Sequence, residues 1–391
     1  MIERIAGSHA RAVFEKYPVL TITGPRQSGK TTLARSVFSD LAYFNLEDLG
    51  TREFALEDPI GFLANVPDGS VIDEIQRAPR LMSQIQVRVD DAGSDGMFVL
   101  TGSSQLSLMD SVSQSLAGRT TLLKLLPFSV PEVAAIGGDI DPDELIFRGF
   151  FPRIYDRGLD PTTTLGDYVE TYVERDLRSI AQIRDLSLFR RFVRLCAGRV
   201  GQLMNLTSLA ADVGVSKTTI SSWLSILEAS YIVFLLQPYH ANIRKRLVKS
   251  PKLYFHDVGL ASYLLGIENS RQISTHPLRG NLFENLVVTE VIKHRYNAGK
   301  RASCTFYRDS SGHEVDLLVE HGGHIHPFEV KAGRTISREF FRGFETLRND
   351  LGDQVSRPIL VYGGDRDEDR TAATVTSIGR LNTRLAEMDE S

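Results

Sequence analysis

The sequence predicts an α/β protein, and two stretches of its 391 residues carry that prediction. Near the start, apolar segments of strand length alternate with segments of helical composition, an order typical of a parallel sheet covered by helices. Near the end, a helical segment precedes short strands separated by Gly-rich turns, an order typical of an antiparallel meander. We therefore expect two different α/β domains with a mainly helical region between them.

The composition is that of an ordinary soluble globular protein. Hydrophobic residues make up 42% of the chain and charged residues 24%, and the length suggests two to three domains. Lys and Arg number 45 against 49 Asp and Glu, so a nucleic-acid contact would need a local basic patch. Two distant cysteines, Cys196 and Cys304, argue against disulfides and a zinc site. A charged, amphipathic N-terminal segment and the lack of an apolar run of about 18 residues predict a cytoplasmic protein without a membrane span.

A phosphate-binding motif follows the first expected strand. Val19 to Thr23 is an apolar run, and it leads through Gly24-Pro-Arg-Gln-Ser-Gly29-Lys30-Thr31 into a helical segment. In G-x-x-x-x-G-K-T, glycines let backbone N–H groups face phosphates, the lysine reaches the β- and γ-phosphates, and the threonine hydroxyl binds Mg²⁺. We predict ATP and Mg²⁺ as cofactors. The expected nucleotide-binding residues are Gly24, Gly29, Lys30, Thr31, Thr32 and Asp73, of which Thr31 and Asp73 hold the metal.

Residues suited to hydrolysis follow later strands. Val71 and Ile72 precede Asp73 and Glu74, so that Asp73 would bind Mg²⁺ and Glu74 would polarise the attacking water. Ser103 follows the strand MFVLTG, where a hydroxyl would sense the γ-phosphate. The runs 43–46 and 122–126 complete about five strands of a parallel sheet. A simpler alternative is that Asp73 and Glu74 are only the first residues of a polar segment.

Four segments, GPRQSGKTT, VIDEIQ, VLTGSSQ and SLAGRTTLLKLLPFS, resemble the AAA-type ATPase module of a large prokaryotic family. That family joins the module to a C-terminal domain of unknown function, and RLVKSPKLYFHDVGLASYLLG resembles its most diagnostic stretch. The resemblance implies ATP hydrolysis in a homo-oligomer. It also nominates Arg119, in LAGRT, as an arginine finger that reaches the γ-phosphate of a neighbouring subunit. The alternative is a solvated arginine before a strand.

The middle of the chain offers candidate DNA contacts. Helical patterns at 206–212 and after Ser216, joined by a turn at Gly214, predict a helix–turn–helix, and the apolar run 231–236 predicts a wing strand. The second helix has a small polar face formed by Lys217, Thr218, Thr219 and Ser222. A basic cluster follows, formed by Arg244, Lys245, Arg246, Lys249 and Lys252. The helix–turn–helix also suits a module that only packs against the rest of the protein, and the basic cluster also suits a solvated strand edge.

The expected C-terminal meander carries a group of charged residues. Glu329 and Lys331 share one strand face, and Asp316 lies on the neighbouring strand of the hairpin. With Glu284 on the preceding helix, the pattern resembles the PD-(D/E)xK nuclease fold, a restriction-endonuclease-like α/β domain. That resemblance implies Mg²⁺ held by Glu284, Asp316 and Glu329, and a catalytic Lys331 that orients water. The alternatives are a charged hairpin edge and an inactive nuclease-like domain.

We therefore predict a P-loop AAA-type ATPase core at 1–135, a helical lid at 136–200, a winged-helix segment at 201–265 and a nuclease-like domain at 266–391. The expected function is an ATP-hydrolysing enzyme that acts on nucleic acid, with metal-dependent cleavage left open. The main alternative is a nucleotide-dependent switch that binds a protein partner and cuts nothing. A third possibility is a protein that binds nucleotide without hydrolysing it.

Overall fold

The computed structural model describes residues 2–103, 116–176, 183, 185–239 and 248–390. The chain divides into two compact units. The first contains Met1–Phe128, Ala229–Tyr231 and Arg295–Lys300, and the second contains Ser129–Glu228, Ile232–His294 and Arg301–Ser391. None of the described helices is long and apolar enough to cross a membrane.

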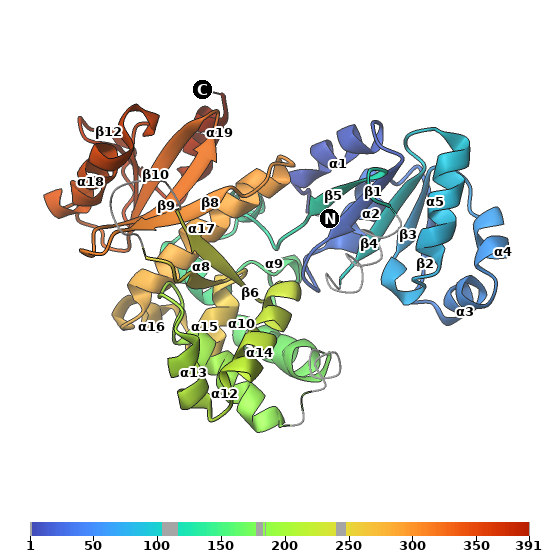
Figure 1. Cartoon of the computed structure of the whole chain (residues 1–391), viewed down its shortest axis with the longest axis horizontal. Coiled ribbons are helices and arrows are strands. Elements are labelled where there is room, and N and C mark those ends of the chain that lie inside the picture. Colours follow the sequence, from blue (N-terminus) through green and yellow to red (C-terminus); the bar gives the residue numbers. More distant parts are fainter. Residues whose placement is uncertain (1, 104–115, 177–182, 184, 240–247, 391) are drawn as a thin grey trace. The chain divides into compact units, whose positions relative to one another are not determined.

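A five-stranded parallel sheet forms the centre of the first unit, as the alternating pattern predicted (blue to cyan in Figure 1). Its strand order is β2-β3-β4-β1-β5. The last strand begins two residues before the predicted run. The strands are β1 (Val19–Thr23), β2 (Ala42–Asn45), β3 (Ser70–Asp73), β4 (Phe98–Gly102) and β5 (Thr120–Lys124).

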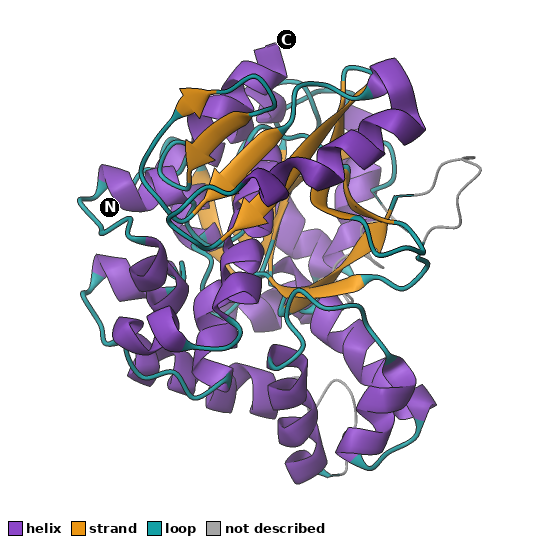
Figure 2. Cartoon of the chain, turned by 90° about the vertical axis from the view of Figure 1, so that its left-hand side faces the viewer, coloured by secondary structure: helices purple, strands orange, loops and turns teal. Residues whose placement is uncertain are grey.

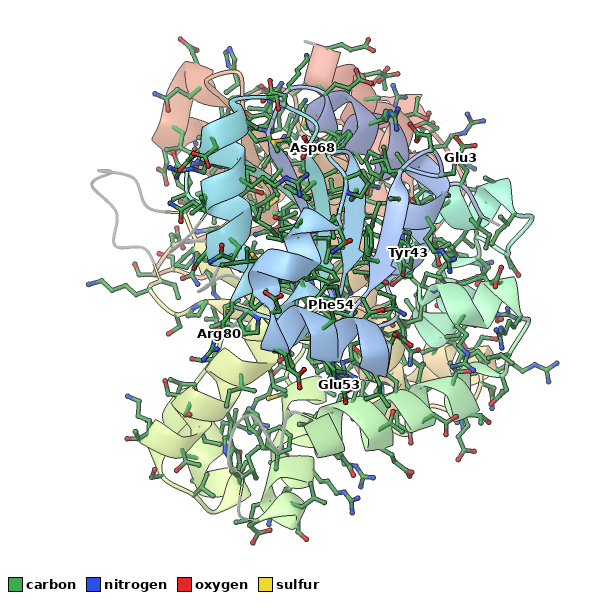
Figure 3. All side chains as sticks on the ribbon, turned by 90° about the vertical axis from the view of Figure 1, so that its right-hand side faces the viewer. Glu3, Tyr43, Glu53, Phe54, Asp68 and Arg80 are labelled. Atoms are coloured by element: carbon green, nitrogen blue, oxygen red, sulfur yellow. The ribbon has the colours of Figure 1, made fainter. Side chains whose placement is uncertain are left out.

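Helices cover both faces of this sheet. On one face, α1 (Ala6–Phe14) and α2 (Lys30–Val37) pack their apolar side chains against Leu20 and Ile22 of β1. On the other face, α3 (Leu49–Glu57), α4 (Pro59–Ala64) and α5 (Leu81–Ala92) pack against a core that includes Val19, Ile72 and Leu100. Figure 3 labels Phe54 on α3 and Tyr43 on β2. Because β1 is buried throughout, its alternating side chains serve both cores.

The second unit begins with a helical region, seen in the lower half of Figure 2. Within it, α13 and α14 are joined at Gly214, whose φ is 90°, and the Ser216 hydroxyl accepts a hydrogen bond from the Thr219 N–H at 3.0 Å. These are the two helices and the turn that the sequence predicted. The helices are α7 (Val130–Ala135), α8 (Pro142–Arg148), α9 (Pro152–Asp156), α10 (Pro161–Tyr168), the π-helix η2 (Val169–Asp176), α12 (Leu186–Ala197), α13 (Leu206–Val213), α14 (Lys217–Ala229), α15 (Val258–Leu264) and α16 (Ser270–Thr275).

An eight-stranded mixed sheet completes the second unit, in the order β12-β13-β11-β10-β9-β8-β6-β7 (Figures 1 and 2). The predicted meander forms as β8, β9 and β10, each antiparallel to the next. The strands are β6 (Val233–Pro238), β7 (Lys252–Phe255), β8 (Cys304–Arg308), β9 (Glu314–His321), β10 (His324–Lys331), β11 (Ile359–Tyr362), β12 (Glu368–Asp369) and β13 (Thr374–Ser377). The remaining helices are α17 (Arg279–Asn297), α18 (Arg342–Leu351) and α19 (Leu381–Glu390).

The expected wing strand, β6, differs from a free wing. It pairs with β7 on one side, but Gln237 and Pro238 also pair in parallel with Thr305 and Phe306 of β8. The borders predicted at 200/201 and 265/266 therefore fall inside one compact unit with one continuous sheet.

Candidate functional site

The loop between β1 and α2 has the backbone that its glycines imply. A Cβ atom on Gly24 would lie 2.1 Å from the backbone oxygen of Leu125, a distance that excludes any side chain. Gly29, with φ at 92°, precedes the first residue of α2 in a left-handed conformation that favours glycine. The loop therefore ends at the N-terminus of a helix, where unpaired backbone N–H groups favour an anion. Thr32, in the first turn, is exposed.

Lys30 folds back onto this loop. Its buried Nζ donates hydrogen bonds to the carbonyl oxygens of Pro25 and Gly24, at 2.7 and 3.1 Å. Burial lowers the pKa of Lys30 to about 8, although the nearby carboxylates of Glu74 and Asp73 favour its charged form. Its partners are neutral carbonyl groups, so an incoming phosphate would give this ammonium a stronger partner.

Asp73, at the end of β3, is buried and accepts hydrogen bonds from three hydroxyl groups. The Thr31 hydroxyl lies 3.0 Å from Oδ2, the Tyr43 hydroxyl lies 2.5 Å from the same oxygen, and the Thr101 hydroxyl contacts Oδ1. The contact of Thr31 with Asp73 brings together two hard oxygen donors, which fit one Mg²⁺ ion. Tyr43 and Thr101 were not predicted here, although Thr101 stands two residues before Ser103.

Glu74 follows in a left-handed conformation, with φ at 58°. Its carboxylate accepts hydrogen bonds from the Ser103 hydroxyl at 3.2 Å and from the Gln76 amide. Its backbone N–H donates to the Thr101 hydroxyl at 3.2 Å. Ser103, predicted to sense the γ-phosphate, thus contacts the predicted catalytic carboxylate. The conformation of Glu74 is uncommon for a residue with a side chain, and such strain is often found at active sites.

Arg119 lies at the opposite end of the sheet from the loop at Gly24. It precedes β5, whose first residue, Thr120, pairs with Val19 at the start of β1. Since β1 rises about 3.3 Å per residue, roughly 15 Å separates the two ends. Arg119 forms an ion pair with Asp90 of α5, with an Nη2–Oδ2 distance of 2.8 Å. This arginine is therefore remote from the loop of its own subunit.

A second group of charged residues lies in the eight-stranded sheet, where Asp316, Glu329 and Lys331 come together as the hairpin predicted. Lys331 Nζ is 2.5 Å from Glu329 Oε1 and 3.4 Å from Asp316 Oδ2. Asp316 Oδ2 also accepts a hydrogen bond from the Val330 N–H at 2.8 Å. Burial and the charge of Asp316 raise the pKa of Glu329 to about 8.

Glu284 of α17 reaches the same group through a lysine. Lys252 Nζ is 2.8 Å from Glu284 Oε1 and 3.9 Å from Asp316 Oδ1, and it also contacts Glu314. The Tyr254 hydroxyl donates to Glu284 as well. Burial, followed by the charge of Asp316, raises the pKa of Glu284 to about 7.

Lys252 corrects the predicted basic patch. This lysine is buried among carboxylates, so it cannot belong to a solvent-facing cluster with Lys249. Arg244, Lys245 and Arg246 lie outside the described residues. Lys252 and Tyr254 share one face of β7, but the sequence did not indicate that this face lies against Glu284.

The carboxylate group offers an open ligand atom that is buried. Glu329 Oε2 is buried and finds no hydrogen-bond donor in the described part of the chain. Within those same residues, no three His, Cys, Asp or Glu side chains are arranged as a ready-made metal cage. If a hard divalent cation binds this group, Glu329 and Asp316 are the carboxylates that would supply its oxygen ligands.

Comparison with known proteins identifies relatives that match most of the chain. An uncharacterized protein of Mycobacterium tuberculosis, Rv2008c, is 33% identical over 370 residues, which cover 93% of this chain and 80% of that protein. The chain belongs to the family of this mycobacterial protein. A further relative, the uncharacterized protein MJ1544 of Methanocaldococcus jannaschii, is 23% identical over 383 residues, covering 89% of this chain and 82% of that protein.

Three family models match successive parts of this chain. Residues 16–134 match an AAA domain, which covers the five-stranded sheet and its loop. Residues 140–271 and 279–381 match two domains of unknown function, DUF8612 and DUF4143. The first unit thus has a P-loop core of the AAA type, as its sequence motifs indicated.

Two solved structures are similar at low identity. The Walker-type ATPase of Pyrococcus abyssi has a TM-score of 0.45 at 14% identity, covering 68% of this chain and 96% of that chain. The AMPPCP-bound DnaA from Aquifex aeolicus has a TM-score of 0.30 at 12% identity, covering 57% of this chain and 85% of that chain.

Proposed function

We propose that this protein binds Mg·ATP at the loop between β1 and α2 and hydrolyses it. The observation that carries the proposal is the contact between the Thr31 hydroxyl and the Asp73 carboxylate, with Glu74 next in the chain. Hydroxyl, carboxylate and candidate base thus gather at the carboxyl ends of the parallel strands β1 and β3, the edge at which ligands bind in such sheets.

Each residue has a role that its surroundings support. Backbone N–H groups of the loop from Arg26 to Thr32 bind the phosphates, and Lys30 exchanges its carbonyl partners for phosphate oxygens. Thr31 and Asp73 hold Mg²⁺, which neutralises the charge that develops on the phosphates when it is bound. Glu74 accepts the proton of the attacking water, and the Ser103 hydroxyl orients the Glu74 carboxylate.

The test compares Glu74→Gln with the wild type. This variant removes the base but leaves Thr31 and Asp73 intact, so ATP affinity should change little while kcat falls by roughly 100-fold or more. Lys30→Ala should instead abolish binding. Glu53→Gln, an exposed change on α3, is the matched control and should leave both quantities unaltered. A Glu74→Gln protein that hydrolyses ATP at the wild-type rate would refute this assignment.

We further propose that the second unit acts on nucleic acid and cleaves phosphodiester bonds with a divalent cation. The supporting observation is that Glu329 Oε2 is buried and finds no hydrogen-bond donor among the described residues. Lys331 contacts the other oxygen of the same carboxylate and also contacts Asp316. A carboxylate pair next to a lysine suits a cation that activates a water molecule near a phosphate. The exposed residues Lys217, Thr218 and Ser222 on α14 are the candidate DNA contacts.

Cleavage is tested on linear and single-stranded DNA with Mn²⁺. Asp316→Ala and Lys331→Ala should abolish cutting, and Glu320→Ala, an exposed change on the same strand as Asp316, should not. The competing function is a nucleotide-dependent switch that binds a protein partner through an inactive nuclease-like domain. Its signature is an uncut DNA substrate together with an ATPase rate that neither single- nor double-stranded DNA alters.

A further inference from the structure

Lys252 is among the most deeply buried charged side chains of the second unit. Only 3% of its side-chain surface is exposed, and its Nζ lies 2.8 Å from Glu284 Oε1 and in contact with Glu314. Lysine is almost never fully buried without a paired carboxylate. Here the ammonium has several carboxylates around it, which come from α17 and from the start of β9.

The surroundings of this ammonium keep it charged. Burial alone would lower the pKa of Lys252, but Glu284, Asp316 and Glu314 outweigh that effect and raise it. The ring of Phe306 lies 5.4 Å from Nζ, within the range of a cation–π contact. Lys252 is therefore a fixed positive charge inside the carboxylate group.

Asp316 divides the group into two sides. Its Oδ1 faces Lys252 at 3.9 Å, and its Oδ2 faces Lys331 at 3.4 Å. The inner side, with Glu284 and Glu314, is neutralised by Lys252, and Glu314 also pairs with Arg308 at 2.9 Å. The outer side contains Glu329, whose Oε2 finds no donor within the described ranges. The outer side thus offers a buried ligand atom that no donor occupies.

We infer that Lys252 is a resident cation of this carboxylate group, which neutralises its inner side and leaves room for one divalent metal ion, beside Asp316 and Glu329. Sites that use two metal ions hold them about 3.5–4 Å apart, and each ion needs its own carboxylate oxygens. One oxygen of Glu284 and one of Glu314, which a second ion would require, are already bound to the ammonium. The single metal ion rests on the proposed nuclease-like site, but the role of Lys252 does not.

The test replaces Lys252 by methionine, which has a similar length and no charge, in the full chain. In EDTA, Lys252→Met should lower the melting temperature by on the order of 10 °C, because a buried carboxylate loses its cation. Mn²⁺ should restore part of that loss, and the variant should bind one more equivalent of Mn²⁺ than the wild type. Lys249→Met, an exposed change three residues earlier, is the control and should match the wild type.

A double variant separates charge from packing. After Lys252 is replaced, Glu314 keeps Arg308 and Asp316 keeps Lys331, so Glu284 is the carboxylate left without a partner cation. Adding Glu284→Gln should therefore restore melting in EDTA and remove the dependence on Mn²⁺. If Lys252→Met fails to fold and the double variant fails as well, Lys252 acts through packing and the inference is wrong. It is equally wrong if Lys252→Met melts like the wild type and binds no additional Mn²⁺.

These measurements do not depend on cleavage. A protein that shows the expected melting and Mn²⁺ binding but cuts no DNA retains the role of Lys252 and loses the proposed nuclease activity. A protein that cuts DNA, and whose melting and Mn²⁺ binding do not change in Lys252→Met, retains the proposed nuclease activity and loses the role of Lys252.

Discussion

At the scale of single residues, the burial of Lys30 predicts a link between nucleotide binding and pH. Burial lowers its pKa to about 8 in the nucleotide-free protein, so at pH 8.5 most molecules hold a neutral amine there. Phosphate groups favour the charged form and raise the pKa of Lys30. Binding should therefore take up a proton above pH 8 and none near pH 6.5, and affinity should fall as pH rises past 8, by at most about tenfold per pH unit.

Calorimetry in buffers of different ionisation enthalpy measures this uptake directly. The binding enthalpy should vary with the buffer at pH 8.5 and be the same in all buffers at pH 6.5. Arginine stays protonated across this range, so a Lys30→Arg protein that still binds should show no buffer dependence at either pH. Equal enthalpies in all buffers at pH 8.5 for the wild type would show that Lys30 is already charged before ATP arrives.

The residues that sequence alone assigned to the proposed nucleotide site are those with a fixed spacing in the motif. Lys30 and Thr31 follow Gly29 directly, and Asp73 ends a short apolar strand, so local order was sufficient. Tyr43 and Lys252 were missed as site residues because their partners are far away in the sequence. Tyr43 meets Asp73 across a strand pair, and Lys252 meets Glu284 between a strand and a helix. Pairs of this kind are set by the tertiary fold.

At the scale of elements, the loop after β1 depends on Gly24. Its missing Cβ leaves the space that the Leu125 backbone fills, just after the end of β5. We expect Gly24→Ala to push the loop away from β5, to lower the melting temperature and to weaken ATP binding by more than tenfold, about 1.4 kcal/mol. Gly50→Ala on α3 is the control, because a Cβ there makes only an ordinary contact at 3.6 Å.

Fluorescence titration with a labelled ATP analogue, alongside thermal melting, measures both effects. The control should bind as well as the wild type and melt at the same or a slightly higher temperature, since alanine favours a helix more than glycine does. Gly24→Ala binding within twofold of the wild type would mean that the loop adjusts without cost.

The elements themselves differed in how far sequence predicted them. The strands around the loop and the meander at β8 to β10 follow local apolar patterns, and both were predicted. The pairing of β6 with β8 joins residues nearly 70 positions apart, and no local pattern indicates it. The same holds for α12, assigned by sequence to a separate lid, whose Phe189 and Phe192 pack on Trp223 of α14. Non-local packing therefore joins segments that lie on either side of the predicted borders.

At the scale of the whole molecule, the position of Arg119 bears on assembly. Because this residue lies at the end of the sheet opposite Gly24, it cannot reach the γ-phosphate of its own subunit. Its ion pair with Asp90 is exposed to solvent, and such pairs contribute little to stability, so the arginine is available at small cost. If Arg119 acts as a finger, it must act on a neighbouring copy of the chain.

We therefore predict that ATP drives self-association and that activity depends on it. In Glu74→Gln, which retains ATP, light scattering should show a larger species with nucleotide than without it. Arg119→Ala should bind ATP normally but lose at least roughly 100-fold in kcat, since arginine fingers contribute on the order of 10³-fold or more. Asp90→Ala frees the arginine without removing it and should keep wild-type turnover.

The wild-type rate per subunit should also rise with protein concentration, because an incomplete site gains its finger only in the assembly. A monomer under both conditions, with a rate per subunit that does not change on dilution, would leave Arg119 as a surface residue and the nucleotide site complete within one chain.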